Sequence, residues 1–127
     1  MKFILDSYAW VEYLEGNSKG IEVRRILKGK NEIYTLSLCI AEVISRAKRK
    51  GANDDIAYRA MTMNSKIISI DEKISRDAGI LHGEIKKKIK DFGLVDAYIL
   101  LIARKLKAKI ITGDKHFKNF KEAILLK

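Results

Sequence analysis

Short apolar runs alternate with longer amphipathic segments along this chain of 127 residues. The short runs are rich in isoleucine and have the length of buried strands, whereas the segments between them have the apolar spacing of helices. Parallel strands need a crossover between them, so this alternation predicts a three-layer α/β fold with a mainly parallel sheet of four or five strands. We expect strands at 2–5, 32–35, 66–70 and 109–112, and an edge strand at 123–126.

Helices are expected in the segments that connect these strands. Ser37 and Asp71 are expected to cap two of them, because short polar side chains accept hydrogen bonds from the first helical N–H groups. Gly79 and Gly83 are potential breaks in the helix that follows Asp71. No linker or repeat divides the sequence, so we expect a single domain spanning residues 1–127. The expected helices span 7–14, 21–27, 37–50, 53–65, the segment after 71, and 94–106, with a helical turn at 115–120.

The chain carries 26 Lys and Arg residues against 16 Asp and Glu residues, which gives a net charge of +10. A basic balance of this size favours a polyanionic partner, because neutralising phosphates releases counterions. Lysine enrichment for heat stability is an alternative, since the chain also lacks Gln and has one Cys. The two interpretations are compatible, and the sequence does not choose between them.

Cellular location is indicated by what the sequence lacks. The apolar stretch at the N-terminus is too short for a signal peptide, and the longest apolar run, 97–103, is too short to span a bilayer. The single cysteine, Cys39, lies in an apolar run and is expected in the core, without a disulfide. We therefore expect a cytoplasmic protein with no membrane association.

Four acidic residues occupy positions where apolar residues are expected. Asp6 follows the first strand, and Asp114 stands in the same relation to the strand at 109–112. Ligands of open α/β sheets bind outside the carboxyl ends of the strands. Asp96 and Glu42 lie inside the apolar runs of two helices, where an unpaired buried carboxylate costs several kcal/mol. Arg46, four residues after Glu42, could instead pair with it.

Carboxylates from separate elements repel one another unless cations neutralise them. An oxygen-only ligand set favours Mg²⁺ or Mn²⁺ over Zn²⁺, and two such ions would offset four carboxylates. Such ions activate water and stabilise charge on a phosphoryl group, so no protein nucleophile is needed. The sequence therefore predicts a metal-dependent hydrolase of phosphodiester bonds.

Four segments that carry these acids resemble the PIN-domain family, and in particular the VapC toxins of toxin–antitoxin pairs. They occur in the family's order and span nearly the whole chain. They are Phe3-Ile4-Leu5-Asp6-Ser7, Ser37-Leu38-Cys39-Ile40-Ala41-Glu42, Gly93-Leu94-Val95-Asp96-Ala97 and Ile111-Thr112-Gly113-Asp114.

The resemblance implies an Mg²⁺- or Mn²⁺-dependent endoribonuclease that acts on RNA, forms a homodimer and is blocked by a small antitoxin protein. It implies that Ser7 and Thr112 orient the ligands or the attacking water. Many members carry a further Asp two residues after the last acid, where this chain has His116. The acids implied to be catalytic and to hold the metal are Asp6, Glu42, Asp96 and Asp114.

Several other residues have both a functional and a structural interpretation. Arg46, Arg49 and Lys50 share a helix with Glu42 and are candidates for contacts with RNA phosphates. Asp71 could be a further ligand, but we expect a helix cap. His116 could act as a base or contact a phosphate, but we expect a solvated loop residue.

Three alternative functions remain open. A housekeeping PIN nuclease that processes ribosomal RNA would have no antitoxin gene beside it. A catalytically silent module that binds RNA or protein would not need all four acids. A phosphotransferase of the haloacid dehalogenase type also begins with a strand and an Asp, but it requires a second Asp at position 8, which is Tyr.

Overall fold

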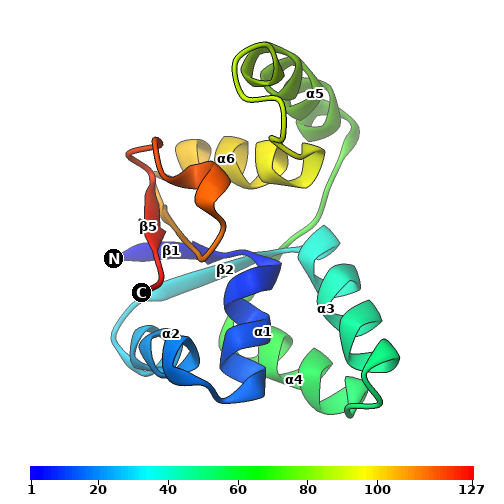
Figure 1. The fold of residues 1–127 in the computed structure, drawn as a ribbon, viewed down its shortest axis with the longest axis vertical. Helices are drawn as coiled ribbons and strands as arrows, with labels where there is room; N and C mark the ends of the chain where they lie inside the picture. Colours follow the sequence, from blue (N-terminus) through cyan, green and yellow to red (C-terminus); the bar gives the residue numbers. More distant parts are fainter.

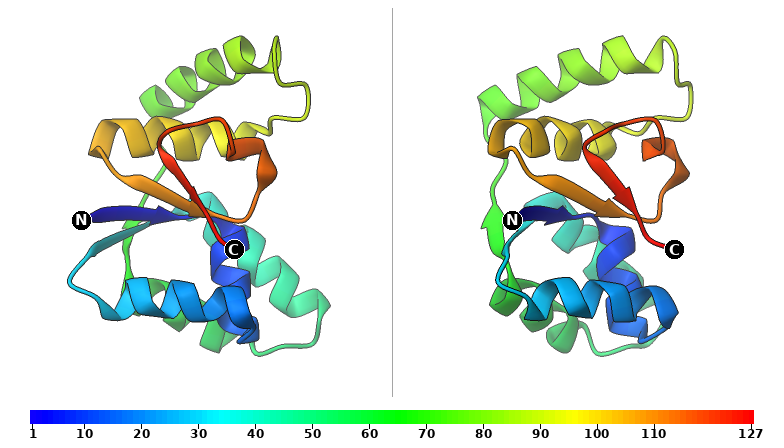
Figure 2. Two further views of the ribbon diagram at one scale, coloured as in Figure 1. Left: turned by 60° about the vertical axis from the view of Figure 1, so that its left-hand side comes forward. Right: turned by 90° about the vertical axis from the view of Figure 1, so that its left-hand side faces the viewer.

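The computed structural model describes residues 1–127 as five parallel strands in one sheet, with helices on both faces (Figures 1 and 2). The order of the strands across the sheet is β3-β2-β1-β4-β5, and every neighbouring pair is parallel. This confirms the expected three-layer α/β fold. The strands are β1 (Lys2–Leu5), β2 (Glu32–Leu36), β3 (Lys66–Ile68), β4 (Lys109–Thr112) and β5 (Ala123–Leu125).

Six α-helices and one 3₁₀ turn connect the strands. The first four helices lie on one side of the sheet and the last two on the other (Figure 1). None of these helices is long and apolar enough to cross a membrane. They are α1 (Ser7–Glu15), α2 (Ser18–Lys28), α3 (Ser37–Arg49), α4 (Asp54–Asn64), α5 (Glu72–Lys86) and α6 (Leu94–Leu106), with the 3₁₀ turn η1 (Lys115–Phe117).

The sheet divides the core into two apolar clusters. Successive strand side chains point to opposite faces, so Ile4 belongs to the cluster beneath α5 and α6, while Phe3 and Leu5 belong to the cluster beneath α1 to α4. Trp10 is fully buried in the second cluster, and its indole N–H donates a hydrogen bond to Thr35 Oγ1 at 3.0 Å. Cys39 is fully buried, as expected from the sequence.

Some helix boundaries differ from the expected ones. Ser37 is the first residue of α3 and not its cap, because Leu36 takes the cap position without a side-chain hydrogen bond. Helix α2 begins earlier than expected, since Asn17 accepts a hydrogen bond from the N–H of Gly20. Helix α5 continues through Gly79 and Gly83, where tertiary packing against α6 overrides the weak helix propensity of glycine.

Candidate metal centre

Asp6 lies at the carboxyl end of the central strand β1. Its carboxylate accepts a hydrogen bond from the N–H of Ala9 at 2.8 Å and thereby caps α1. Its own N–H donates to the carbonyl of Ile111 on the neighbouring strand β4. Only 4% of Asp6 is exposed, so local structure fixes this carboxylate at the edge of the sheet.

Asp114 reaches the same edge from β4, because β1 and β4 are parallel and Leu5 pairs with Ile111. Thr112 is fully buried, and its hydroxyl accepts a hydrogen bond from the N–H of Asp114 at 2.9 Å. Asp114 then caps η1 by accepting a hydrogen bond from the N–H of His116 at 2.9 Å. The chain is therefore held by hydrogen bonds on both sides of this acid.

Asp96 enters from the opposite layer, at the first turn of α6. Its side chain accepts a hydrogen bond from the N–H of Gly93 at 3.2 Å. The sequence suggested a carboxylate surrounded by apolar residues, but Asp96 is only partly buried, because it lines the open cavity from the first turn of α6. Part of the cost of removing this acid from water is therefore offset by helix capping.

Glu42 is exposed on α3, which corrects the expectation that its apolar neighbours bury it. Its neighbour Val43 is buried instead, since α3 presents one face to the core. Arg46 does not neutralise Glu42, because its guanidinium forms an ion pair with Glu15 at 3.1 Å. Glu42 is therefore available to a cation.

A cavity of about 400 Å³ brings all four acids together. It contains five carboxylates and two guanidinium groups, so its side chains carry a net negative charge in a protein whose total charge is +10. Cations are needed to neutralise this surplus. The lining residues are Asp6, Ser7, Tyr8, Val11, Glu12, Glu42, Arg46, Arg49, Val95, Asp96, Ile99 and Asp114.

Burial and mutual repulsion both act on these acids. Burial, with smaller contributions from Asp96 and Asp114, raises the pKa of Asp6 from 3.8 to about 7, although the Thr112 hydroxyl and the Ala9 N–H partly offset this. Burial is also the largest cause of the raised pKa of Asp96, and Asp114 and Glu42 add to it. A bound cation would reverse these shifts by stabilising the ionised carboxylates.

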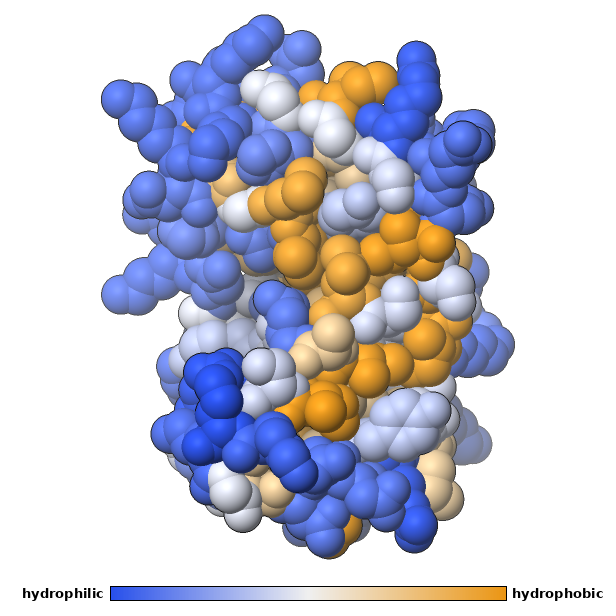
Figure 3. Space-filling view, turned by 90° about the vertical axis from the view of Figure 1, so that its right-hand side faces the viewer, coloured by the Kyte–Doolittle hydropathy of each residue, from blue (hydrophilic) through white to orange (hydrophobic).

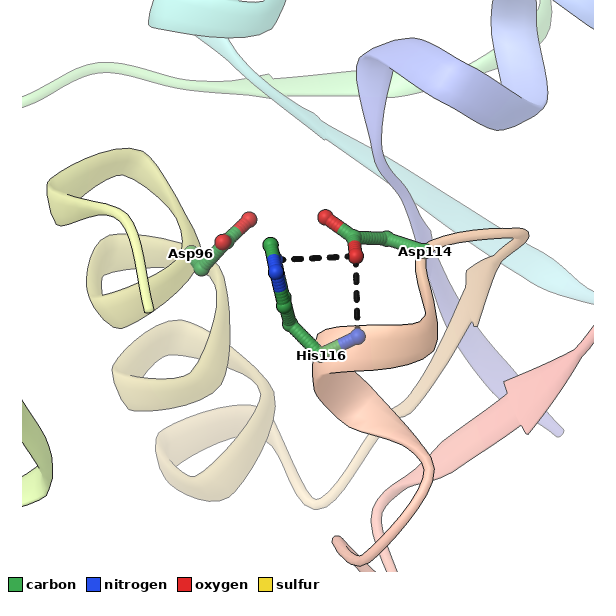
Figure 4. Close-up of side chains that lie close together, drawn as sticks. All are labelled: Asp96, Asp114 and His116. Carbon is green, nitrogen blue, oxygen red and sulfur yellow. Dashed lines mark hydrogen bonds and ion pairs between the residues drawn. The ribbon is translucent and has the colours of Figure 1, made fainter. Parts of the chain in front are cut away.

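A three-residue cluster within the site has the arrangement of a metal-ligand set. Asp96, Asp114 and His116 each offer a ligand atom, and these atoms lie within 4.8 Å of one another. Figure 4 shows the Asp96 carboxylate on α6 facing the imidazole of His116 and the carboxylate of Asp114. The donor set is two carboxylates and one imidazole, whereas the sequence predicted oxygen ligands alone.

The structure places some candidate residues outside the cavity. Lys50 lines a different groove, beside α1 and α4, so it does not share the cavity with Arg46 and Arg49. Asp71 is the cap of α5 and accepts a hydrogen bond from the N–H of Ile74 at 2.8 Å, as expected. His116 belongs to η1, which lies in the expected helical turn, but its side chain is only partly exposed and lies beside Asp96 and Asp114, which corrects the expected solvated position.

The sequence interpretation missed Glu12 and Gly113. Glu12 lies one helical turn after Tyr8 on α1, and both residues line the cavity. Their spacing of four places them on one helix face, so this signal was available in the sequence. Gly113 lies against the ring of Tyr8, a contact between residues distant in sequence that no local pattern indicates.

The fold and the acidic cavity define a class: α/β proteins with clustered acids at the carboxyl edge of a parallel sheet. The model of the PIN-domain family matches residues 3–123. The chain therefore belongs to the PIN-domain family. No curated protein sequence matches the chain.

Solved structures share this fold along the whole chain. A chain of a toxin–antitoxin complex from Klebsiella pneumoniae is 21% identical, with a TM-score of 0.77, and the alignment covers 98% of this chain and 97% of that chain. A chain of the promoter-bound VapBC2 of Rickettsia felis is 23% identical, with a TM-score of 0.73 and the same coverage. VapC20 of Mycobacterium tuberculosis, a sarcin–ricin loop cleaving toxin, is 14% identical, with a TM-score of 0.72 and coverage of 94% and 97%.

Proposed function

We propose that this protein is a metal-dependent endoribonuclease and the toxin of a toxin–antitoxin pair. The observation that carries the proposal is the cavity that unites Asp6, Glu42, Asp96 and Asp114 in a strongly basic protein. A basic surface attracts a polyanion, and an acidic cavity accepts its phosphates only together with cations. This combination fits metal-assisted cleavage of a nucleic acid.

The residues fit one or two Mg²⁺ or Mn²⁺ ions. The four acids would hold the metal, since carboxylate oxygens are the ligands that these hard cations prefer. Bound there, the metal would activate water and stabilise the negative charge that develops on the phosphoryl group. The buried polar atom of His116 that lacks a hydrogen-bond partner also fits a cation at this position.

The protein groups around the acids have positioning roles in this proposal. The Ala9 N–H fixes the orientation of the Asp6 carboxylate, and Thr112 fixes the chain before Asp114. Ser7, the first residue of α1, lines the cavity and is available to orient a water molecule. Arg49 borders the same cavity and would supply positive charge for the phosphates that flank the cleaved bond, and Arg46 would do so by exchanging its pair with Glu15 for a phosphate.

RNA is the proposed substrate because VapC20, which shares this fold, is described as a toxin that cleaves the sarcin–ricin loop. An antitoxin partner is proposed because two other structures with this fold are a toxin–antitoxin complex and a VapBC pair. The charge of the cavity supports such a partner, since an inserted Arg or Lys would supply the positive charge that the carboxylates lack. These structural relatives favour the toxin over the housekeeping nuclease.

A homodimer is proposed from the apolar surface beside the cavity. Figure 3 shows an apolar band that crosses the face on the right of Figure 1, from the upper layer to the lower one. The β3–α5 segment and the first turns of α3 and α6 lie on this side, and β3 is an edge strand. Apolar residues from these segments that stay half-buried or exposed are Leu38, Ile68, Ile70, Ile74 and Leu94.

The dimer is tested by measuring the mass in solution by light scattering. Leu94 is 50% exposed in the first turn of α6, which lies on this side of the molecule, so Leu94→Lys is expected to give monomers without unfolding. Ile21 is 53% exposed on α2, away from this face, and Ile21→Lys is the matched control. A wild-type protein that is monomeric at high concentration contradicts the proposed dimer.

The nuclease is tested by incubating the purified protein with RNA in Mg²⁺, Mn²⁺ or EDTA. Asp96→Asn should abolish metal-dependent cleavage and keep the fold, since the amide retains the shape of the side chain but loses its charge. Asp71→Ala is the control: it should keep activity and lose about 0.5–2 kcal/mol of stability as a lost cap. Cleavage by Asp96→Asn at the wild-type rate, or none by the wild type with either metal, overturns the proposal.

A further inference from the structure

The imidazole of His116 has a nitrogen without a hydrogen-bond partner. Nδ1 of His116 is buried although 38% of the side chain is exposed, so this atom faces the interior of the site and not the solvent. Nδ1 is paired electrostatically with Oδ1 of Asp114 at 3.0 Å, the dashed line between these side chains in Figure 4, but the orientation of the ring does not give a hydrogen bond. A buried polar atom without a partner costs free energy, and a bound cation would remove that cost.

The position of this nitrogen is set by the surrounding structure. Asp114 accepts the N–H of His116, which closes the turn η1. The next residue, Phe117, is fully buried and packs edge-on against Phe92, with ring centroids 5.7 Å apart. The turn is therefore anchored in the core, and the imidazole faces the carboxylates from a fixed backbone (Figure 4).

The separation of the two atoms matches neighbouring ligands on one ion. Nitrogen and oxygen ligands lie about 2.1 Å from small divalent cations, so two ligands at right angles are about 3.0 Å apart. The Nδ1–Oδ1 distance in this structure is 3.0 Å. Asp96 offers a third ligand atom within 4.8 Å of the other two.

We propose that His116 is a metal ligand through Nδ1, beside Asp114 and Asp96, and that this nitrogen makes the site prefer Mn²⁺ over Mg²⁺. The inference rests on the proposed metal-dependent function and adds a ligand to it. Mg²⁺ takes oxygen ligands almost exclusively, whereas imidazole is a common ligand of transition metals, whose affinities for nitrogen sites exceed that of Mg²⁺. An Asp at position 116 would instead give an all-carboxylate set.

The direct test is electron spin-echo spectroscopy of the full-length protein loaded with Mn²⁺ and free of RNA. We expect modulation from a coordinated nitrogen, which changes when the protein contains ¹⁵N-histidine. The chain has two histidines, and the other, His82, hydrogen-bonds through Nε2 to the carbonyl of Phe92 at 3.0 Å. His82→Gln should therefore keep the nitrogen signal, and His116→Gln should lose it.

Calorimetric titration with Mn²⁺ or Mg²⁺ alone measures the preference. His116→Gln should weaken Mn²⁺ binding by about tenfold or more and affect Mg²⁺ binding less. His116→Asp should strengthen Mg²⁺ binding and reverse the preference. The circular dichroism of the metal-free variants checks that each one folds. The spin-echo spectrum of the wild-type protein tests the nitrogen ligand without any substitution.

Two outcomes overturn the inference: no nitrogen signal in the wild type, or equal Mn²⁺ affinity in the wild type and a folded His116→Gln variant. Neither measurement uses RNA, so both are independent of the nuclease assay. A nitrogen signal in a protein that cleaves no RNA upholds the ligand and contradicts the proposed function. Cleavage without a nitrogen signal upholds the function and contradicts the ligand.

Discussion

The ring of Tyr8 lies against the backbone of Gly113, so closely that a Cβ atom at position 113 would fall within 3 Å of three ring atoms. Tyr8 belongs to the first turn of α1 and lines the acidic cavity, whereas Gly113 lies just after β4, between Thr112 and Asp114. The Tyr8 hydroxyl also accepts a hydrogen bond from Lys19 at 3.1 Å. Because position 113 has no side chain, the ring of Tyr8 can pack against the backbone there and form one wall of the cavity.

Gly113→Ala is expected to displace Tyr8 and weaken RNA binding without unfolding the protein. Tyr8 is 36% exposed and its ring can rotate outward, so we expect a change in melting temperature of a few degrees and a several-fold higher KM for RNA. The matched control is Gly79→Ala, since a Cβ atom at position 79 meets nothing within 4 Å and alanine favours the helix by about 0.5–1 kcal/mol. In a Tyr8→Ala background, Gly113→Ala should have no further effect on KM; an undiminished effect contradicts the role of Tyr8.

Divalent metal should stabilise the folded protein, because the carboxylates converge only in the native state. At a free metal concentration of about 100 Kd, mass action adds about 2.7 kcal/mol to the free energy of unfolding. A thermal melt with Mg²⁺ and with Mn²⁺ measures this. The variant with all four acids changed to amides should show no shift, whereas Asp71→Asn, an exposed cap, should behave like the wild type. An equal shift in all three proteins indicates a general salt effect.

The stability of the metal-free protein should fall as the pH rises toward neutrality. The pKa of Asp6 is raised from 3.8 to about 7, so the folded state binds more protons than the unfolded state between these values. The penalty for ionising Asp6 is absent below pH 4 and complete above about pH 7. Asp6→Asn removes it and can still cap α1, so the stability gap between variant and wild type should widen by about 2–3 kcal/mol from pH 5 to pH 8 in EDTA.

Urea titrations at each pH measure this gap. Saturating Mg²⁺ should abolish the trend in the wild type, because a bound cation stabilises the ionised carboxylate and competes with the proton. A gap that stays constant from pH 5 to pH 8 would show that Asp6 does not titrate in this range.

The antitoxin and the metal are expected to compete for the same carboxylates. We expect the protein to co-purify with a small partner encoded by the adjacent gene, whose C-terminal segment places a basic side chain near Asp6, Glu42, Asp96 and Asp114. High Mg²⁺ should then weaken the complex, and Asp71→Ala should leave it unchanged. Co-expression followed by RNase assays of the complex tests this. A complex that cleaves RNA at the rate of the free protein contradicts occlusion of the cavity, and the lack of a partner gene favours the housekeeping nuclease.

The sequence by itself determined the class of the fold and the four acids. The alternation of apolar runs with amphipathic segments is a local pattern that follows from burial of strands between helices, so the strands and their order along the chain could be predicted. Asp6 and Asp114 were recognised for a similar reason: each follows a buried strand, and parallel strands end at one edge of the sheet. The cap at Asp71 joins residues only three positions apart, so it too could be predicted from the sequence, and the prediction was correct.

Only the tertiary structure decided which neighbours these residues have. The pairing of Arg46 with Glu15, and the separation of Lys50 from the cavity, depend on how α1 and α3 pack and not on spacing within α3. The ring of Tyr8 against Gly113 likewise joins residues that are distant in sequence. The buried face of His116 is a further case, because the anchored turn η1 directs one ring nitrogen inward while the rest of the ring meets solvent. Burial and contact between separate elements arise only when the sheet assembles, so local sequence patterns cannot specify them.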